Sequence, residues 1–191
     1  MLIEFNSTPA NQPDRQAYLA TEIKANTIGS MAILAMKPGA GRLTIHGKRM
    51  VAQSMYGKGK SFLGAALLLR EKKGYEYVVL HLICQAFEIT LKGLLLLRDY
   101  DKYNRDLKRS FGHDLKKLAS AASREFGVKL KPATLLSELQ NLNSLYSTHR
   151  LRYGNFHDVL VAPDTIESVA VLRKLAAVIR LTDRHLFSRS K

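Results

Sequence analysis

The sequence has a single cysteine and no tryptophan. Cys84 lies within an apolar run, so the chain alone can form neither a disulfide framework nor a cysteine zinc site. We therefore expect a reducing, cytoplasmic environment in which Cys84 packs as a small core residue. No two of the six histidines are three or four residues apart, so a local metal-ligand pair is also lacking. The sequence predicts no metal and no other cofactor.

Acidic residues are scarce as well. The 191 residues include 16 Asp and Glu against 30 Lys and Arg, which gives a formal net charge of +14. Such an excess of positive charge attracts polyanions through long-range electrostatics. RNA is therefore the favoured partner. The alternative is a protein whose basic surface has no role in binding nucleic acid.

A signal peptide is not visible, because the opening MLIEFNSTPANQPDRQ has an early acid, prolines and polar residues but no apolar core segment. Residues 78–97 are apolar and numerous enough to cross a bilayer. They nevertheless include His81, Gln85, Glu88 and Lys92, which is too much polarity for a helix that faces lipid. We therefore expect no association with a membrane.

Helical periodicity is clearest from residue 61 onward. The expected helices cover approximately residues 17–36, 61–73, 76–99, 113–126, 132–153 and 164–187. Residues 43–60 are ambiguous and could include a short strand at 43–46. Short connections between helices favour antiparallel neighbours, so we expect an all-α antiparallel bundle of four or five helices. Residues 1–55 would form a partly helical or flexible N-terminal extension, and residues 56–191 the bundle.

The motif GKGKS at residues 57–61 resembles the end of a phosphate-binding P-loop. Ser54 stands where that motif needs its first glycine, and no convincing strand comes before it. The better interpretation is a basic turn that precedes a helix.

Four polar residues follow one another along the apolar segment at steps of 4, 3 and 4, so they share one face of the expected helix: His81, Gln85, Glu88 and Lys92. One interpretation is a solvated face on which Glu88 and Lys92 form an i,i+4 pair. The other is a face that lines a polar groove or meets a partner subunit.

Residues 61–187 resemble the HEPN domain, a helical-bundle family of prokaryotic toxins, abortive-infection proteins and RNA-processing enzymes. The resemblance lies in QAFEITLKGLL, then GHDLKKLA, then LNSLYSTHRLRYGNFHD. Catalytic members carry an arginine, four to six residues and a histidine; Arg152 and His157 fit this spacing, as do Arg150 and His157. Arg180 and His185 have the same spacing, so the position of Arg152 and His157 before the last helix is what favours them.

The resemblance implies a metal-independent endoribonuclease of toxin or defence type, with its site in a cleft at a dimer interface. His157 would be the general base or acid, and Arg152 would hold the scissile phosphate with help from Arg150. Asn155 would bind phosphate or orient His157. Further substrate contacts are expected from His149, Tyr153, Glu88 and Lys92.

The same residues leave alternatives open. Tyr153 and Gly154 after Arg152 also resemble HEPN relatives without nuclease activity, which would bind RNA, a nucleotide or a partner protein. A structural dimerisation domain is a third class. The expected partners are RNA, a second copy of the chain, and an antitoxin or a nucleotidyltransferase-like protein. Gly154 decides whether Arg152 and His157 can meet, because an unbroken helix would point residues five apart in divergent directions.

Overall fold

The computed structural model describes residues 43–127, 133–153 and 160–187. The chain divides into two units, Met1–Arg42 and Leu43–Lys191, and the described residues all belong to the second. Their elements are α2 (Ile45–Glu71), α3 (Glu76–Arg98), α4 (Tyr100–Asp106), the π-helical turn η1 (Leu107–Phe111), α5 (Leu115–Phe126), α6 (Ala133–Ser147), α7 (Arg150–Tyr153), the 3-10 turn η2 (Pro163–Thr165) and α9 (Val169–Phe187). The predicted all-α bundle is thus confirmed. The helix predicted at 17–36 lies outside the described residues.

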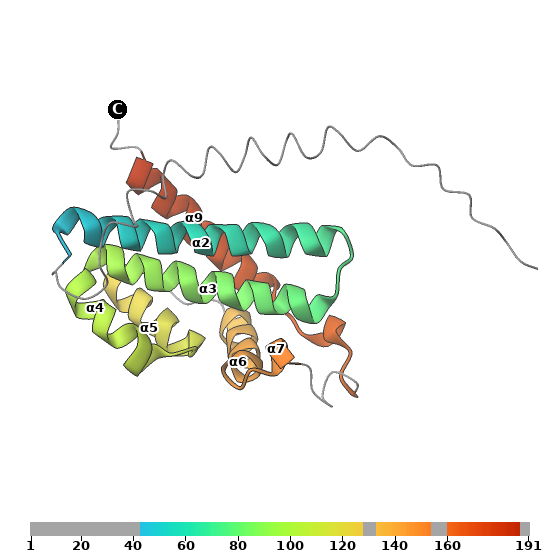
Figure 1. Cartoon of the computed structure of the whole chain (residues 1–191). Coiled ribbons are helices and arrows are strands. Elements are labelled where there is room, and N and C mark those ends of the chain that lie inside the picture. The colour runs from blue at the N-terminus through green and yellow to red at the C-terminus, as the bar shows by residue number, and fades with distance from the viewer. Residues whose placement is uncertain (1–42, 128–132, 154–159, 188–191) are drawn as a thin grey trace, which may run out of the picture. The chain divides into compact units, whose positions relative to one another are not determined.

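The antiparallel pair of α2 and α3 forms the centre of the bundle (Figure 1). Helix α3, which the sequence predicted at 76–99, contacts α2, α4, α5, α6, α7 and α9, so it is the core helix of the bundle. By length and composition it could cross a membrane, but 67% of its apolar window is buried inside the protein. Burial within the bundle accounts for its apolar character.

The first helix starts much earlier than the periodicity indicated. Thr44 caps α2, because its side-chain oxygen accepts a hydrogen bond from Gly47 N at 3.1 Å. Residues 45–60 are therefore helical, and the short strand considered at 43–46 is absent. The motif GKGKS lies in the middle of α2, so it forms neither a P-loop nor the basic turn that we expected. Helix α2 also runs across residue 55, where the bundle was predicted to begin.

Two glycines allow α2 and α3 to approach until their backbones touch. A Cβ atom on Gly59 would lie 2.7 Å from the backbone nitrogen of Thr90, and one on Gly93 would lie 2.7 Å from the backbone nitrogen of Tyr56. Backbone atoms cannot move aside as a flexible side chain can. Glycine at 59 and 93 is therefore required for this helix spacing, and Gly59 belongs to the motif that suggested phosphate binding.

The last helix is fixed by polar contacts with α2 and α6. Tyr56 Oη lies 3.0 Å from both the Ile179 carbonyl oxygen and Asp183 Oδ1. Asp183 also accepts a hydrogen bond from Lys60 at 2.8 Å. At the other end, the buried Glu138 carboxylate accepts a hydrogen bond from Val171 N at 3.0 Å, where it faces the positive end of the α9 dipole.

Two predicted helix boundaries in the C-terminal half need correction. The helix expected over 164–187 begins later, at Val169, and the Thr165 side chain donates a hydrogen bond to the carbonyl of Ala162. The single helix predicted over 132–153 is broken at His149, whose φ is +60°. Asp114 and Gly127 do bound α5, as expected from capping preferences.

We predict that Gly59→Ala and Gly93→Ala each destabilise the protein by about 2 kcal/mol, because the added methyl group meets fixed backbone. Gly57→Ala and Gly64→Ala are matched controls on α2, since nothing lies within 4 Å of their added Cβ atoms. The controls should stabilise by about 0.5–1 kcal/mol through helix propensity. Urea denaturation followed by circular dichroism measures all four, and equal effects in the two groups would contradict the close helix contact.

Candidate functional site

The candidate site is built around a buried carboxylate, that of Glu88 on α3. Its Oε1 accepts a hydrogen bond from Lys92 Nζ at 2.5 Å. Its Oε2 accepts one from Tyr146 Oη at 2.5 Å and lies 3.0 Å from His113 Nδ1. The donors come from α3, from α6 and from the turn before α5, so one side chain connects three parts of the bundle.

The ionisation of this group follows from two opposed effects. Burial is the largest single influence and by itself raises the pKa of Glu88. The hydrogen bonds from Lys92, Tyr146 and His113 together outweigh it, and they hold the pKa of Glu88 below its usual range. Burial, followed by the bond to this carboxylate, raises the pKa of Tyr146. Near neutral pH, Glu88 is therefore ionised and Tyr146 carries its proton.

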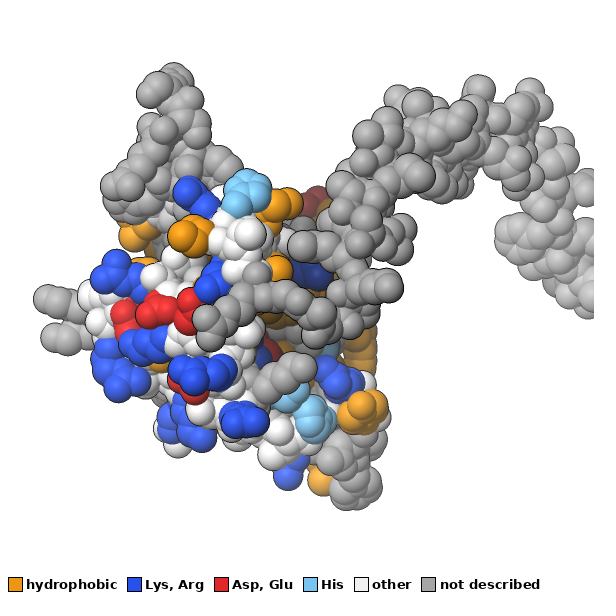
Figure 2. Space-filling model, turned by 60° about the vertical axis from the view of Figure 1, so that its left-hand side comes forward, with side chains coloured by type: hydrophobic (Ala, Val, Ile, Leu, Met, Phe, Trp, Pro, Cys, Tyr) orange, Lys and Arg blue, Asp and Glu red, His pale blue; other side chains and the backbone are white. Residues whose placement is uncertain are grey.

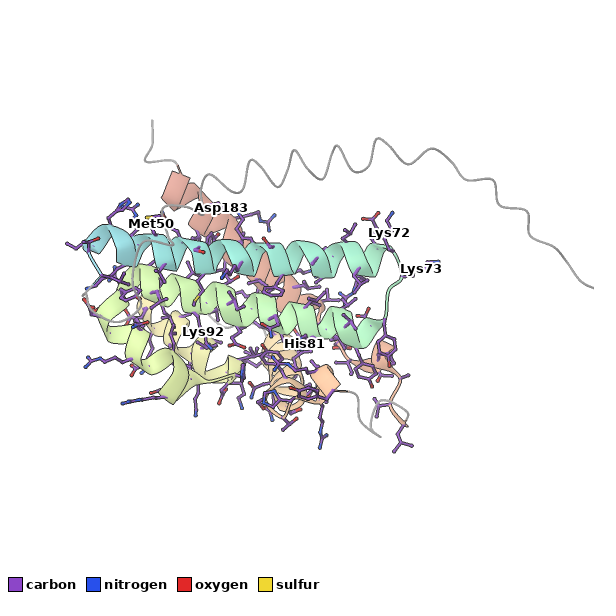
Figure 3. The ribbon with its side chains drawn as sticks, in the orientation of Figure 1. Met50, Lys72, Lys73, His81, Lys92 and Asp183 are labelled. Carbon is purple, nitrogen blue, oxygen red and sulfur yellow. The ribbon has the colours of Figure 1, made fainter. Side chains whose placement is uncertain are left out.

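The polar face of α3 thus points into the bundle rather than into solvent. Figure 3 shows His81 and Lys92 on the side of α3 toward the shorter helices. Glu88 and Lys92 form the i,i+4 pair that the spacing predicted, but both side chains are largely buried. Lys92 Nζ also donates to the carbonyl oxygen of Gly112 at 2.6 Å, which fixes the turn that carries His113. For Glu88 and Lys92, the interpretation of this helix face as solvated is therefore wrong.

Two histidines contact the ring of Tyr146, and a third contacts one of these two. The ring centroids of His81 and His113 lie 5.7 and 5.8 Å from that of Tyr146. His149 follows, with its centroid 5.4 Å from that of His113. More than 30 positions separate His81 from His113 and His113 from His149, and the packing of α3, α5 and α6 brings the three histidines together.

His149 occupies the turn between α6 and α7 in the left-handed backbone region, with φ of +60°. Residues other than glycine rarely adopt this conformation, because it costs free energy. It persists only where the surrounding structure stabilises it, and such positions cluster at functional sites. Backbone bonds hold the turn: His149 N donates to the Tyr146 carbonyl and Arg152 N donates to the His149 carbonyl, both at 3.0 Å. The buried Leu151 anchors the short helix that follows.

Helix α7 presents Arg150, Arg152 and Tyr153 to solvent. Tyr153 is 75% exposed, and the Arg152 guanidinium lies 5.9 Å above the centre of its ring. Within the described ranges, no carboxylate pairs with either arginine. The predicted site residues Asn155 and His157 lie outside the described residues.

His81 connects the buried cluster to α7. Burial, and then the positive charge of Arg152, lowers the pKa of His81. Its Nδ1 atom is buried and has no hydrogen-bond partner within the described part of the chain. A neutral imidazole is the form that such surroundings favour.

Basic side chains are also common on the surface of the protein. Figure 2 shows Lys and Arg side chains spread over the face in view, with fewer acidic ones between them. Across residues 43–127, 133–153 and 160–187, no group of three or more His, Cys, Asp or Glu side chains is arranged to hold a metal ion.

Comparison with family models matches residues 52–181 to the HEPN domain. The chain belongs to the HEPN family. Comparisons with curated proteins and with solved structures gave no match. The region matched to HEPN includes the Glu88 cluster and all of α7.

Sequence reasoning missed two members of the Glu88 cluster. It placed His113 at the start of the helix expected over 113–126 and Tyr146 inside the helix expected over 132–153, and gave neither residue a role in a site. Tyr146 does lie within α6 and His113 just before α5, but each side chain also bonds Glu88. Glu88 itself could have predicted these donors. A carboxylate within an apolar, buried helix requires hydrogen-bond donors from elsewhere in the chain.

We predict that Glu88→Gln lowers the free energy of unfolding by about 2 kcal/mol at pH 7, because the buried donors lose an ionised acceptor. The native pKa of Glu88 lies below its ordinary value of 4.5. Its contribution to stability is therefore fully present above pH 4.5 and lost as the pH falls through the native pKa. The stability difference between wild type and Glu88→Gln should shrink on acidification.

Urea titrations between pH 7 and pH 3 measure this difference. Glu71→Gln is the matched control, because the Glu71 side chain is 71% exposed and only faces its neighbour Lys72. The control should lie close to the wild-type curve throughout. Parallel pH curves for wild type and Glu88→Gln would contradict the lowered pKa.

Proposed function

We propose that this HEPN protein is a metal-independent endoribonuclease, in which Arg152 binds the scissile phosphate and His157 acts as general acid or base. The observation that carries the proposal is the state of Arg152. It is exposed, it has no carboxylate partner within the described residues, and it lies beside a cluster of histidines. An arginine that is paired with a carboxylate would be less available to bind a phosphate.

Arg152 suits the role of phosphate ligand for geometric reasons. A guanidinium group offers a planar fork of donors that matches two phosphate oxygens, and it remains charged at every physiological pH. It can therefore stabilise the negative charge that develops on the phosphate during attack. Arg150 lies on the same exposed turn and would hold a neighbouring phosphate.

The nucleophile in this proposal is the ribose 2′-hydroxyl, so RNA is cut and DNA is not. The 2′-oxygen attacks phosphorus, the bond to the 5′-oxygen breaks, and the products are a cyclic phosphate and a 5′-hydroxyl. His157 transfers a proton in this step, a role for which an imidazole is chemically suited. Asn155 orients His157 or donates to the phosphate.

Tyr153 and His149 would contact the bases. Tyr153 is the most exposed aromatic side chain near the site, and unpaired RNA bases stack readily on such rings. Glu88 and Lys92 are largely buried, so in this proposal they support the groups around them rather than touch RNA themselves. The formal charge of +14 attracts the RNA backbone to the surface.

The wider setting of the proposal follows the family resemblance. The active unit would be a homodimer with two copies of the motif at one cleft, and the protein would act in the cytoplasm as a toxin or defence factor. An antitoxin or a nucleotidyltransferase-like protein would be its partner.

A non-catalytic HEPN module is the second candidate, and Tyr153 is the observation that favours it. A bulky ring directly after Arg152 leaves less room at the phosphate than a small polar residue would. This candidate predicts RNA affinity that falls steeply with salt, without any cleavage.

We predict that the wild type cleaves single-stranded RNA in the presence of EDTA. His157→Ala should lower the rate by a factor of about 10²–10⁴ through loss of proton transfer. Arg152→Ala should lower it by about 10² through loss of charge stabilisation. Arg124→Ala, an exposed arginine near the end of α5, should cleave at the wild-type rate.

Gel separation of labelled RNA measures these rates, and the products should end in cyclic phosphates. Equal cleavage by wild type and His157→Ala would show that a contaminating nuclease is responsible. Binding without cleavage by the wild type would favour the non-catalytic candidate instead.

A further inference from the structure

His113 is held by one of its ring nitrogens and exposed at the rest of its side chain. Nδ1 lies 3.0 Å from Glu88 Oε2, yet 44% of the side chain is accessible to solvent. The two nitrogens of an imidazole lie on opposite edges of the ring, so fixing Nδ1 against the buried carboxylate directs Nε2 outward. Within the described ranges, no hydrogen bond or ion pair engages Nε2.

The charge of Glu88 decides which nitrogen carries the proton in the neutral ring. Glu88 is ionised, because Lys92 and Tyr146 both donate to it. An ionised carboxylate only accepts hydrogen bonds, so Nδ1 of His113 must be the donor. Nε2 then has the free lone pair, and the imidazole is ready to accept a proton at its exposed edge.

A series of ring contacts links His113 to the proposed RNA site on α7. The His113 ring meets the ring of His149 edge to face at 5.4 Å, and His149 meets Tyr153 at 6.3 Å. The Arg152 guanidinium covers the other side of the series, above Tyr153. A phosphate bound by Arg152 would therefore have a second basic group within the same cluster of side chains.

We propose that His113 is the general base of this site and that Glu88 is the residue that positions it. The inference rests on the proposed function and extends it, because cleavage of RNA needs one group to remove a proton and another to supply one.

In the proposed step, Nε2 of His113 takes the proton from the ribose 2′-hydroxyl as the 2′-oxygen bonds to phosphorus. The bond from phosphorus to the 5′-oxygen breaks, and that oxygen takes a proton from the acid, which is then His157. His113 ends protonated and His157 unprotonated, so no net proton is gained or lost. The Glu88 carboxylate stabilises the imidazolium that forms, without becoming protonated itself.

His113→Asn tests the base most cleanly, because the asparagine amide nitrogen can take the place of Nδ1 and donate to Glu88. The variant should keep its fold and its RNA affinity within about threefold, but cleave about 10²–10⁴ times more slowly. His46→Ala is the matched control, an exposed histidine near the start of α2, and it should cleave at the wild-type rate. Free imidazole should restore part of the rate to His113→Ala.

Circular dichroism and RNA binding accompany the cleavage assay. If wild type cleaves, His157→Ala does not, and His113→Asn is as fast as wild type, the role of His113 is overturned while the proposed function stands. A His113→Ala variant that binds RNA but gains nothing from imidazole would overturn it as well. If the wild type cleaves no RNA, the proposed function fails and the assignment of a base fails with it.

Glu88→Gln provides the independent test of positioning. It should lower the rate at saturating RNA while RNA affinity stays within about threefold, because Glu88 acts through His113 and does not touch RNA. A loss of affinity without a loss of rate would overturn the positioning role.

Discussion

The carboxylate of Glu88 is the group on which the rest of the site depends. A buried charge is tolerated only when it is fully hydrogen-bonded, and here the donors come from Lys92, Tyr146 and His113. Satisfying this single group therefore fixes α6 against α3 and fixes the turn before α5. Removing any one donor would leave part of the charge without compensation, so the local packing and the ionisation of Glu88 are mutually dependent.

The same arrangement explains how a short, exposed helix can be part of a defined site. Helix α7 has only four residues, which is too few to be stable alone. It is held by the buried Leu151 and by the His149 turn, and that turn packs on His113, which Glu88 anchors. The charged side chains of α7 are thus placed by contacts that begin in the core of the bundle, two helices away.

The sequence predicted the helical class well and the site only in part. The apolar α3 and the Asp114 and Gly127 boundaries follow from local chemistry, so they could be read from neighbouring residues. The glycines of GKGKS were misinterpreted because Gly59 is needed for a contact with Thr90, which lies 31 positions away. His113 and Tyr146 were missed for the same reason, since the group that gives them a role is on another helix.

The break between α6 and α7 at His149 could not be predicted from the sequence. A helix pattern continues through residues 148–153, and no glycine or proline marks the turn within them. The left-handed backbone of His149 is stabilised by packing around it, and nothing in its own sequence neighbourhood predicts it.

The central claim is that Glu88 holds His113 in the tautomer protonated on Nδ1, with Nε2 free for RNA. Long-range proton–nitrogen NMR spectra of the histidine rings measure this directly at a pH where His113 is neutral. The account predicts a protonated Nδ1 for His113 in the wild type, a change in Glu88→Gln, and a shift of the Nε2 signal when 2′-O-methyl RNA is added. A proton on Nε2 of His113 in the wild type would contradict this account. So would His113 signals that change neither in Glu88→Gln nor on addition of the RNA.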